Sequence, residues 1–76
     1  MVTKSEVIEL ITKKLPNSRV SVETFNGNDH LQVTVISSDF NGLSLVKQHQ
    51  LVYSALKSEL ASEAIHALAL KTQTSN

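Results

Sequence analysis

Three histidines are the side chains in this sequence best suited to binding a metal or moving a proton near neutral pH. They are His30, His49 and His66, and the sequence contains no cysteine. Without cysteine, the chain offers no disulfide, no thiolate nucleophile and no thiolate metal ligand. Any metal that it holds must therefore be bound through histidine, aspartate or glutamate.

His66 follows Ile65 and precedes Ala67, in an apolar run that is expected to open the last strand. A lone histidine in apolar company is more often a structural, partly buried residue than a ligand, by about two to one. The residues alone therefore favour a structural role for His66, with metal binding as the alternative.

His30 is expected to begin the second strand, just after a hairpin turn. If that strand and the last one are parallel neighbours, both begin at the same edge of the sheet. This topology would bring His30 and His66 to one end of the molecule. A solvated turn histidine is an equally good interpretation of His30.

His49 lies between Gln48 and Gln50 in an expected long helix. Its polar neighbours favour a structural or surface role by about three to one. The alternative is a binding face that His49 forms with Lys47 and Tyr53. Tyr53 is four residues further along, so it could equally pack on His49 within the helix.

The remaining residues do not suggest catalysis or strong nucleic-acid binding. No serine, histidine or aspartate stands in a nucleophile elbow, so we expect a protein that is not an enzyme. Seven Lys and Arg balance seven Asp and Glu, so the field that attracts phosphate backbones is missing. The two glycines, Gly27 and Gly42, do not form the GxxG loop with which KH domains clamp phosphates.

Length and composition indicate one folded domain over residues 1–76. A chain of this size has room for a single core, and its 41% apolar and 18% charged residues are typical of globular proteins. It has neither a membrane-spanning run nor an N-terminal signal pattern. We therefore expect a cytoplasmic protein that does not enter the membrane.

The first half of the chain predicts a helix followed by a hairpin. Thr3 and Glu6 are spaced as a capping box, and helical spacing of apolar residues continues over residues 4–14 until Pro16 ends it. Residues 19–25 alternate as a half-buried strand, with Val20 and Val22 on one face. Asn26-Gly27 suits a type I′ turn into a second strand with Leu31, Val33 and Val35.

The second half predicts a loop, a long helix and a strand. Residues 37–42 are loop-forming, and Ser44 can cap a helix over residues 45–57. Its apolar positions are Leu45, Val52, Leu56 and Leu60. A break near residues 60–62, with one extra helical turn, precedes an extended segment over 65–72 and a frayed end over 73–76.

Together these elements predict an α+β fold in the order α-β-β-α-(short α)-β. Two strands joined through a helix are normally parallel and close together. We therefore expect a three-stranded mixed sheet with helices packed on one face.

Two segments carry a resemblance to a known family. The stretch from Phe40 to Leu56, with Gly42, Ser44 and His49, is followed by Ile65-His66-Ala67-Leu68. Together with His-Leu-Gln-Val at residues 30–33, these motifs cover about half of the chain and closely resemble the signature of BolA-like proteins. The short hairpin loop and the lack of cysteine resemble the compact branch of that family that includes IbaG.

The resemblance implies a fold similar to class II KH domains and a partnership with a monothiol glutaredoxin. In that partnership a [2Fe-2S] cluster bridges the two proteins, held by the glutaredoxin cysteine, by glutathione and by the BolA side. It implies His66 as a cluster ligand and reverses the odds above, with His30 as the candidate second ligand. Lys47, His49 and Tyr53 are the candidate partner-binding residues, in a protein that is a monomer alone and a heterodimer with its partner.

The sequence departs from the family pattern at two places. The family often continues after the last strand with Thr-Pro-x-x-Trp, where this chain has Thr72-Gln-Thr-Ser-Asn76. The family's loop ligand commonly stands a few residues before the second strand, where this chain has Gly27, Asn28 and Asp29, with His30 as the residue able to substitute.

The leading functional hypothesis is an accessory protein of iron-sulfur and iron homeostasis that acts in the stress response. The alternative is a nucleic-acid-binding transcriptional regulator that uses Lys47, Lys57 and Lys71, which zero net charge disfavours. A third hypothesis is a protein-interaction module whose histidines are structural.

Overall fold

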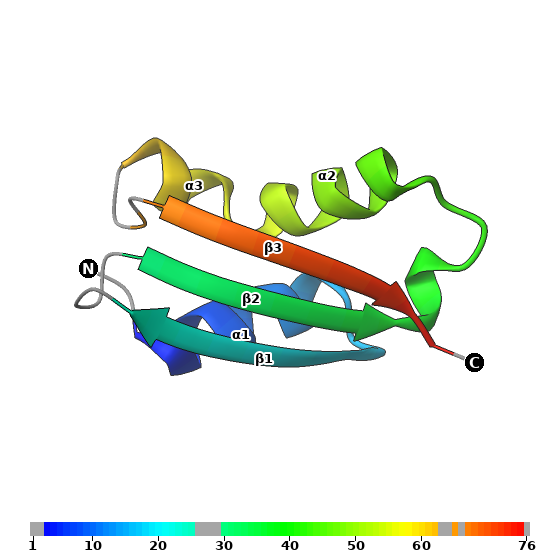
Figure 1. The fold of residues 1–76 in the computed structure, drawn as a ribbon, viewed down its shortest axis with the longest axis horizontal. Coiled ribbons are helices and arrows are strands. Elements are labelled where there is room, and N and C mark those ends of the chain that lie inside the picture. Colours follow the sequence, from blue (N-terminus) through cyan, green and yellow to red (C-terminus); the bar gives the residue numbers. More distant parts are fainter. Residues whose placement is uncertain (1–2, 26–29, 63–64, 66, 76) are drawn as a thin grey trace.

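The computed structural model describes residues 3–25, 30–62, 65 and 67–75. The elements are α1 (Lys4–Lys14), β1 (Ser18–Phe25), β2 (His30–Ser37), the 3-10 turn η1 (Ser38–Phe40), α2 (Leu45–Ala55), α3 (Lys57–Ala61) and β3 (Ala67–Thr74). The sheet order is β1-β2-β3, with α1 against β1 and α2 along β3 (Figure 1). The predicted α+β fold with a three-stranded mixed sheet is confirmed.

Helix α1 forms as its sequence predicts. The Thr3 Oγ1 atom accepts a hydrogen bond of 3.1 Å from the Glu6 backbone N–H, while the Thr3 N–H donates to the Glu6 carboxylate over 3.3 Å. This capping box satisfies backbone donors that the first helical turn leaves unpaired. Val7 and Ile11 lie one turn apart and are fully buried, so α1 contributes one apolar stripe to the core.

The β1–β2 hairpin is confirmed, and its register differs from the one that a two-residue turn would give. The strands are antiparallel and pair Val22 with Val33 and Phe25 with His30. A two-residue loop at Asn26-Gly27 would pair Phe25 with Asn28 instead. A shift of two residues keeps every side chain on its own face, so the apolar pattern could not distinguish the two registers. The turn itself lies outside the described residues.

β3 runs parallel to β2 and extends further than predicted. Its register pairs His30 with Ala67 and Ser37 with Thr74. Residues 73 and 74, predicted to fray, belong to the strand. Beyond them, the Ser75 N–H donates to the Ser37 carbonyl over 3.3 Å. Pairing with a central strand therefore overrides the polar character of this segment.

The long helix predicted over residues 45–57 is shorter than expected. Ser44 caps it as predicted, with its Oγ accepting from the Lys47 N–H over 3.3 Å. The helix ends at Ala55, because the Leu56 N–H bonds to the Tyr53 carbonyl, three residues back, before α3 begins. The long helix therefore breaks at Leu56, and the predicted extra helical turn is α3, which ends at Ala61.

Apolar spacing on the long helix does not by itself determine burial, and the predicted loop contains a short helical turn. Leu45 is 61% exposed, whereas Val52 and Leu56 are fully buried. The segment predicted as loop over residues 37–42 contains η1, where the Ser37 Oγ accepts from the Asp39 N–H over 3.1 Å. This turn places Phe40, the largest fully buried side chain, in the core.

Within the described part of the chain, the buried apolar residues form one cluster between the helices and the sheet. They are Val7, Ile11, Leu15, Val22, Leu31, Val33, Val35, Phe40, Val52, Leu56 and Ile65. None of the described helices has the length and apolar content that crossing a membrane requires.

Candidate functional site

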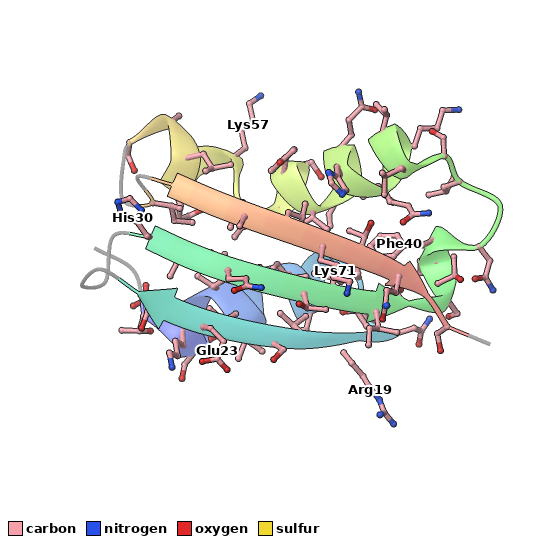
Figure 2. The ribbon with its side chains drawn as sticks, viewed as in Figure 1. Arg19, Glu23, His30, Phe40, Lys57 and Lys71 are labelled. Carbon is pink, nitrogen blue, oxygen red and sulfur yellow. The ribbon has the colours of Figure 1, made fainter. Side chains whose placement is uncertain are left out.

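The sequence predicted that candidate metal ligands lie at the end of the sheet where β2 and β3 begin. His30 is the first residue of β2, it is half-buried, and its register partners are Phe25 on β1 and Ala67 on β3 (Figure 2). The premise that the second and last strands are parallel neighbours is therefore confirmed. In the sequence, the residue before Ala67 is His66, which lies outside the described residues.

The chain that leads into β3 is anchored from both sides of residue 66. Before it, Ile65 is buried in the core, and its N–H donates to the Glu59 carbonyl of α3 over 3.2 Å. After it, Ala67 enters the sheet opposite His30. Burial of Ile65 and pairing of Ala67 thus tie both chain neighbours of His66 to the edge of the sheet that carries His30.

His49 and Tyr53 contact each other on α2. Their ring centroids are 6.1 Å apart and the ring planes make an angle of 84°, an edge-to-face arrangement. His49 is half-buried and Tyr53 is 40% exposed. The spacing of four residues brings the two rings together on one side of the helix.

Lys47 lies on a different side of α2 from His49. Residues two positions apart in an α-helix are separated by about 200° around its axis. Lys47 lines a shallow depression of about 290 Å³ with Leu43, Gln50 and Leu51. The three candidate partner-binding residues therefore divide into the pair His49–Tyr53 and the separate Lys47.

Gln48 is a buried polar residue that the sequence argument treated as a surface neighbour of His49. Its Nε2 donates to the Leu43 carbonyl over 3.0 Å, and its Oε1 accepts from the Thr72 hydroxyl over 2.7 Å. Its position four residues before Val52 was the available signal, because that spacing places both on one helical face. Gln48 holds α2 to β3 through these two hydrogen bonds.

Metal-ligating residues do not gather in the described part of the chain. No group of three or more His, Asp or Glu residues is placed there to hold a metal ion. His30 and His49 lie on different elements, at the start of β2 and on α2.

Comparison with known proteins gives consistent matches along the chain. The family model described as BolA-like protein matches residues 7–76. An uncharacterized protein of Rickettsia prowazekii is 33% identical over 72 residues, which cover 93% of this chain and 92% of that protein. BolA-like protein 1 of Bos taurus is 49% identical over 45 residues, covering 59% of this chain and 33% of the bovine protein.

Solved structures share the fold over almost the whole chain. A bolA protein homologue from Coxiella burnetii has a TM-score of 0.80 and 40% sequence identity, covering 97% of this chain and 92% of that chain. The BolA domain of SufE1 from Arabidopsis thaliana has a TM-score of 0.81 and 30% identity, covering 97% of this chain and 95% of that chain.

Proposed function

The chain belongs to the BolA-like family, and on that premise we propose that it binds a monothiol glutaredoxin and shares a bridging [2Fe-2S] cluster with it. The complex would act in iron-sulfur and iron homeostasis and in the stress response. The observation that carries the proposal is the parallel pairing of β2 with β3, which sets His30 opposite Ala67, the chain neighbour of His66.

The donor chemistry of this sheet edge suits a shared cluster. Neutral imidazole ligates iron in Rieske [2Fe-2S] centres, where two histidines replace two cysteines on one iron. Because the sequence contains no cysteine, histidine is the ligand that we propose for this chain's share of the cluster. Glutaredoxin cysteine and glutathione would supply the remaining ligands.

This chain's own residues would position and support the ligands. His66 would be the principal ligand, and His30, the first residue of β2, would be the second. Burial of Ile65 and its hydrogen bond to Glu59 restrict the chain just before the ligand position. Lys47, His49 and Tyr53 of α2 are the candidate contacts to the partner protein. The cluster, when bound, would supply redox or cluster-transfer chemistry.

Co-expression with the monothiol glutaredoxin of the same host tests this proposal. We expect the two proteins to copurify as a heterodimer with the visible absorption and circular dichroism of a [2Fe-2S] cluster. Each protein purified alone serves as the control. Copurification without a cluster would leave a simple interaction module, and failure to copurify would overturn the proposal.

A mobility-shift assay with random duplex DNA tests the alternative function, a nucleic-acid-binding transcriptional regulator. The described lysines of that hypothesis lie on three different elements, Lys47 on α2, Lys57 on α3 and Lys71 on β3. We therefore expect affinity no tighter than the roughly 10⁻⁴ to 10⁻⁶ M of non-specific binders at physiological salt.

A further inference from the structure

β3 is an outer strand with one unpaired edge. The sheet order is β1-β2-β3, so β3 has a sheet neighbour only on the β2 side among the described strands. Backbone groups of a strand point alternately to its two sides, and the Ser75 N–H donates to Ser37 of β2. Leu68, Leu70 and Thr72 therefore direct their N–H and C=O groups away from β2, toward the open edge. Such an edge is a template for one more strand.

Helix α2 overhangs this edge. The hydrogen bond from Thr72 to Gln48 fixes which side of α2 faces β3. The opposite neighbour of α2 is α1, since the two helices enclose a depression lined by Leu10, Lys13, Lys14, Ser54 and Ala55. The remaining flank points outward past β3, and Figure 1 shows α2 running along the outer side of that strand.

This outward flank carries Leu45, His49 and Tyr53, spaced four residues apart, which we call the edge stripe. Leu45 is 61% exposed, Tyr53 is 40% exposed, and His49 is half-buried against the Tyr53 ring. Residues at this spacing line one side of a helix. Two of the three large exposed apolar residues of the described chain therefore lie above the open strand edge.

The inner side of β3 is also incompletely covered. On the central strand β2, the residues facing the helices, such as Leu31 and Val33, are buried. Their counterparts Leu68 and Leu70 on β3 are only half-buried. The register pairs Leu31 with Leu68 and Val33 with Leu70, so the difference arises from the missing neighbour on the edge side.

Charge at this edge is positive. Lys71 is exposed on the face of β3 away from the helices, and Lys57 projects from the start of α3 (Figure 2). Neither forms an ion pair with a described residue, whereas Lys4 pairs with Glu23 of β1. Described glutamates gather on the α1 side, where Glu6, Glu9 and Glu59 line a common depression.

We propose that the β3 edge and the edge stripe form a docking groove for an extended segment of a partner protein, in which apolar and acidic residues alternate. The segment would add a fourth strand beside β3. Its apolar side chains would pack under Leu45 and Tyr53, and its carboxylates would face Lys71 on the other side of the sheet. Strand addition of this kind takes affinity from backbone hydrogen bonds and specificity from alternate side chains.

A second copy of this chain does not fit the same groove. Antiparallel pairing would set the two β3 strands about 5 Å apart, and both α2 helices, which overhang that edge, would then meet on the same face of the joined sheet. Packed helices need about 8–10 Å between their axes. Pairing centred on Lys71 would also set two ammonium groups opposite each other. An isolated acidic strand meets neither obstacle.

A synthetic peptide tests the groove without glutaredoxin or cluster, so the result is independent of the function proposed above. The probe is an acetylated and amidated peptide, Glu-Val-Glu-Val-Glu-Val-Glu. Fluorescence anisotropy of the labelled peptide measures its binding, and NMR hydrogen exchange of the apo-protein locates the site. We expect the amides of Leu68, Leu70 and Thr72 to gain protection on binding, while those of Ala69 and Lys71, which face β2, change little. Peptides that are N-methylated at alternate residues, or that carry Lys in place of Glu, should not bind.

Matched variants separate the groove from general charge and folding effects. Lys71→Glu should weaken peptide binding by about fivefold, as expected for reversing a cross-strand charge pair. Lys14→Glu makes the same change in net charge on α1 and should leave binding unchanged. Leu45→Ser removes an exposed apolar contact, so it should weaken binding without lowering thermal stability.

Three results would overturn the proposal. The first is no binding at millimolar peptide. The second is protection of amides outside β3, which would place the peptide elsewhere. The third concerns the protein without peptide. If protection of the Leu68, Leu70 and Thr72 amides rises with protein concentration, and sedimentation shows a dimer, the edge binds a second copy of this chain.

Discussion

Gln48 is the residue that sets the orientation of α2 on the sheet. Its amide uses both a donor and an acceptor, bonding to the Leu43 carbonyl and to the Thr72 hydroxyl. Buried polar groups stabilise a fold only when they are paired, and every buried side-chain polar atom in the described residues has a partner. The same orientation turns Leu45, His49 and Tyr53 outward.

Replacing Thr72 with valine tests this interaction. The hydroxyl is lost while the shape is nearly kept, so the Gln48 Oε1 atom stays buried without its donor. We expect the free energy of unfolding to fall by about 1–3 kcal/mol in urea denaturation. Thr34→Val on β2 is the control, because Thr34 donates no side-chain hydrogen bond to a described residue, and its effect should be near zero. Equal effects of the two substitutions would show that Gln48 and Thr72 are not coupled.

The sequence predicted the position of single residues best where strand pairing alone determines it. His30 stands at the start of β2, as its place after the hairpin predicted. Gln48 was missed, because a glutamine between charged and polar neighbours gives no sign that a threonine 24 residues away supplies its partner. The ligand roles of His30 and His66 stay predictions.

At the scale of elements, α2 shows why apolar spacing alone is an incomplete guide to the core. Leu45 and Leu56 are both apolar positions of the predicted helix, but Leu45 is exposed and Leu56 is fully buried. The helix ends at Ala55, so Leu56 does not continue its regular rotation. Burial at the two leucines therefore follows from where the helix ends and from the Gln48 anchor.

Replacing each of these two leucines with alanine measures the difference in burial as a difference in stability. Leu56→Ala should cost about 2–5 kcal/mol of unfolding free energy, because it opens a cavity in the core. Leu45→Ala removes the same atoms from an exposed site and should change stability by no more than about 0.5 kcal/mol. Thermal and urea unfolding of both variants provide the measurement. A loss at Leu45 as large as that at Leu56 would contradict the burial described here.

Local signals predicted the elements whose ends depend on nearby residues. The capping box gave α1 its start, and alternation gave β1 and β2 their faces. The hairpin register was not determined, since a two-residue shift preserves those faces. The extension of β3 to Thr74 and the burial of Phe40 in η1 depend on contacts with Ser37 and the core, which are distant in sequence.

At the scale of the whole molecule, an apolar core links the helices to all three strands. Among the described residues, eleven buried apolar residues from α1, β1, β2, η1, α2 and the connections form one cluster, and the half-buried Leu68 and Leu70 of β3 pack against it. Small domains often need metal or disulfides to fold, but a contiguous core of this kind can be sufficient.

The apo-protein should accordingly fold without metal. We expect cooperative thermal unfolding with the same midpoint in the presence and absence of a chelator such as EDTA. Structural metal sites couple binding to folding, so their proteins unfold when the metal is removed. A lower midpoint or loss of cooperativity after chelation would assign a metal to the fold itself.

The cluster spectrum of the glutaredoxin complex in three histidine variants tests the central claim most directly. His66→Ala should abolish or strongly weaken the visible circular dichroism of the [2Fe-2S] cluster, because it removes an imidazole ligand from iron. Its stability should fall by only about 1–2 kcal/mol. His30→Ala should weaken the cluster less, and His49→Ala, on α2, should leave it almost unchanged. An unaltered cluster signature in His66→Ala would contradict the account and return this histidine to a structural role.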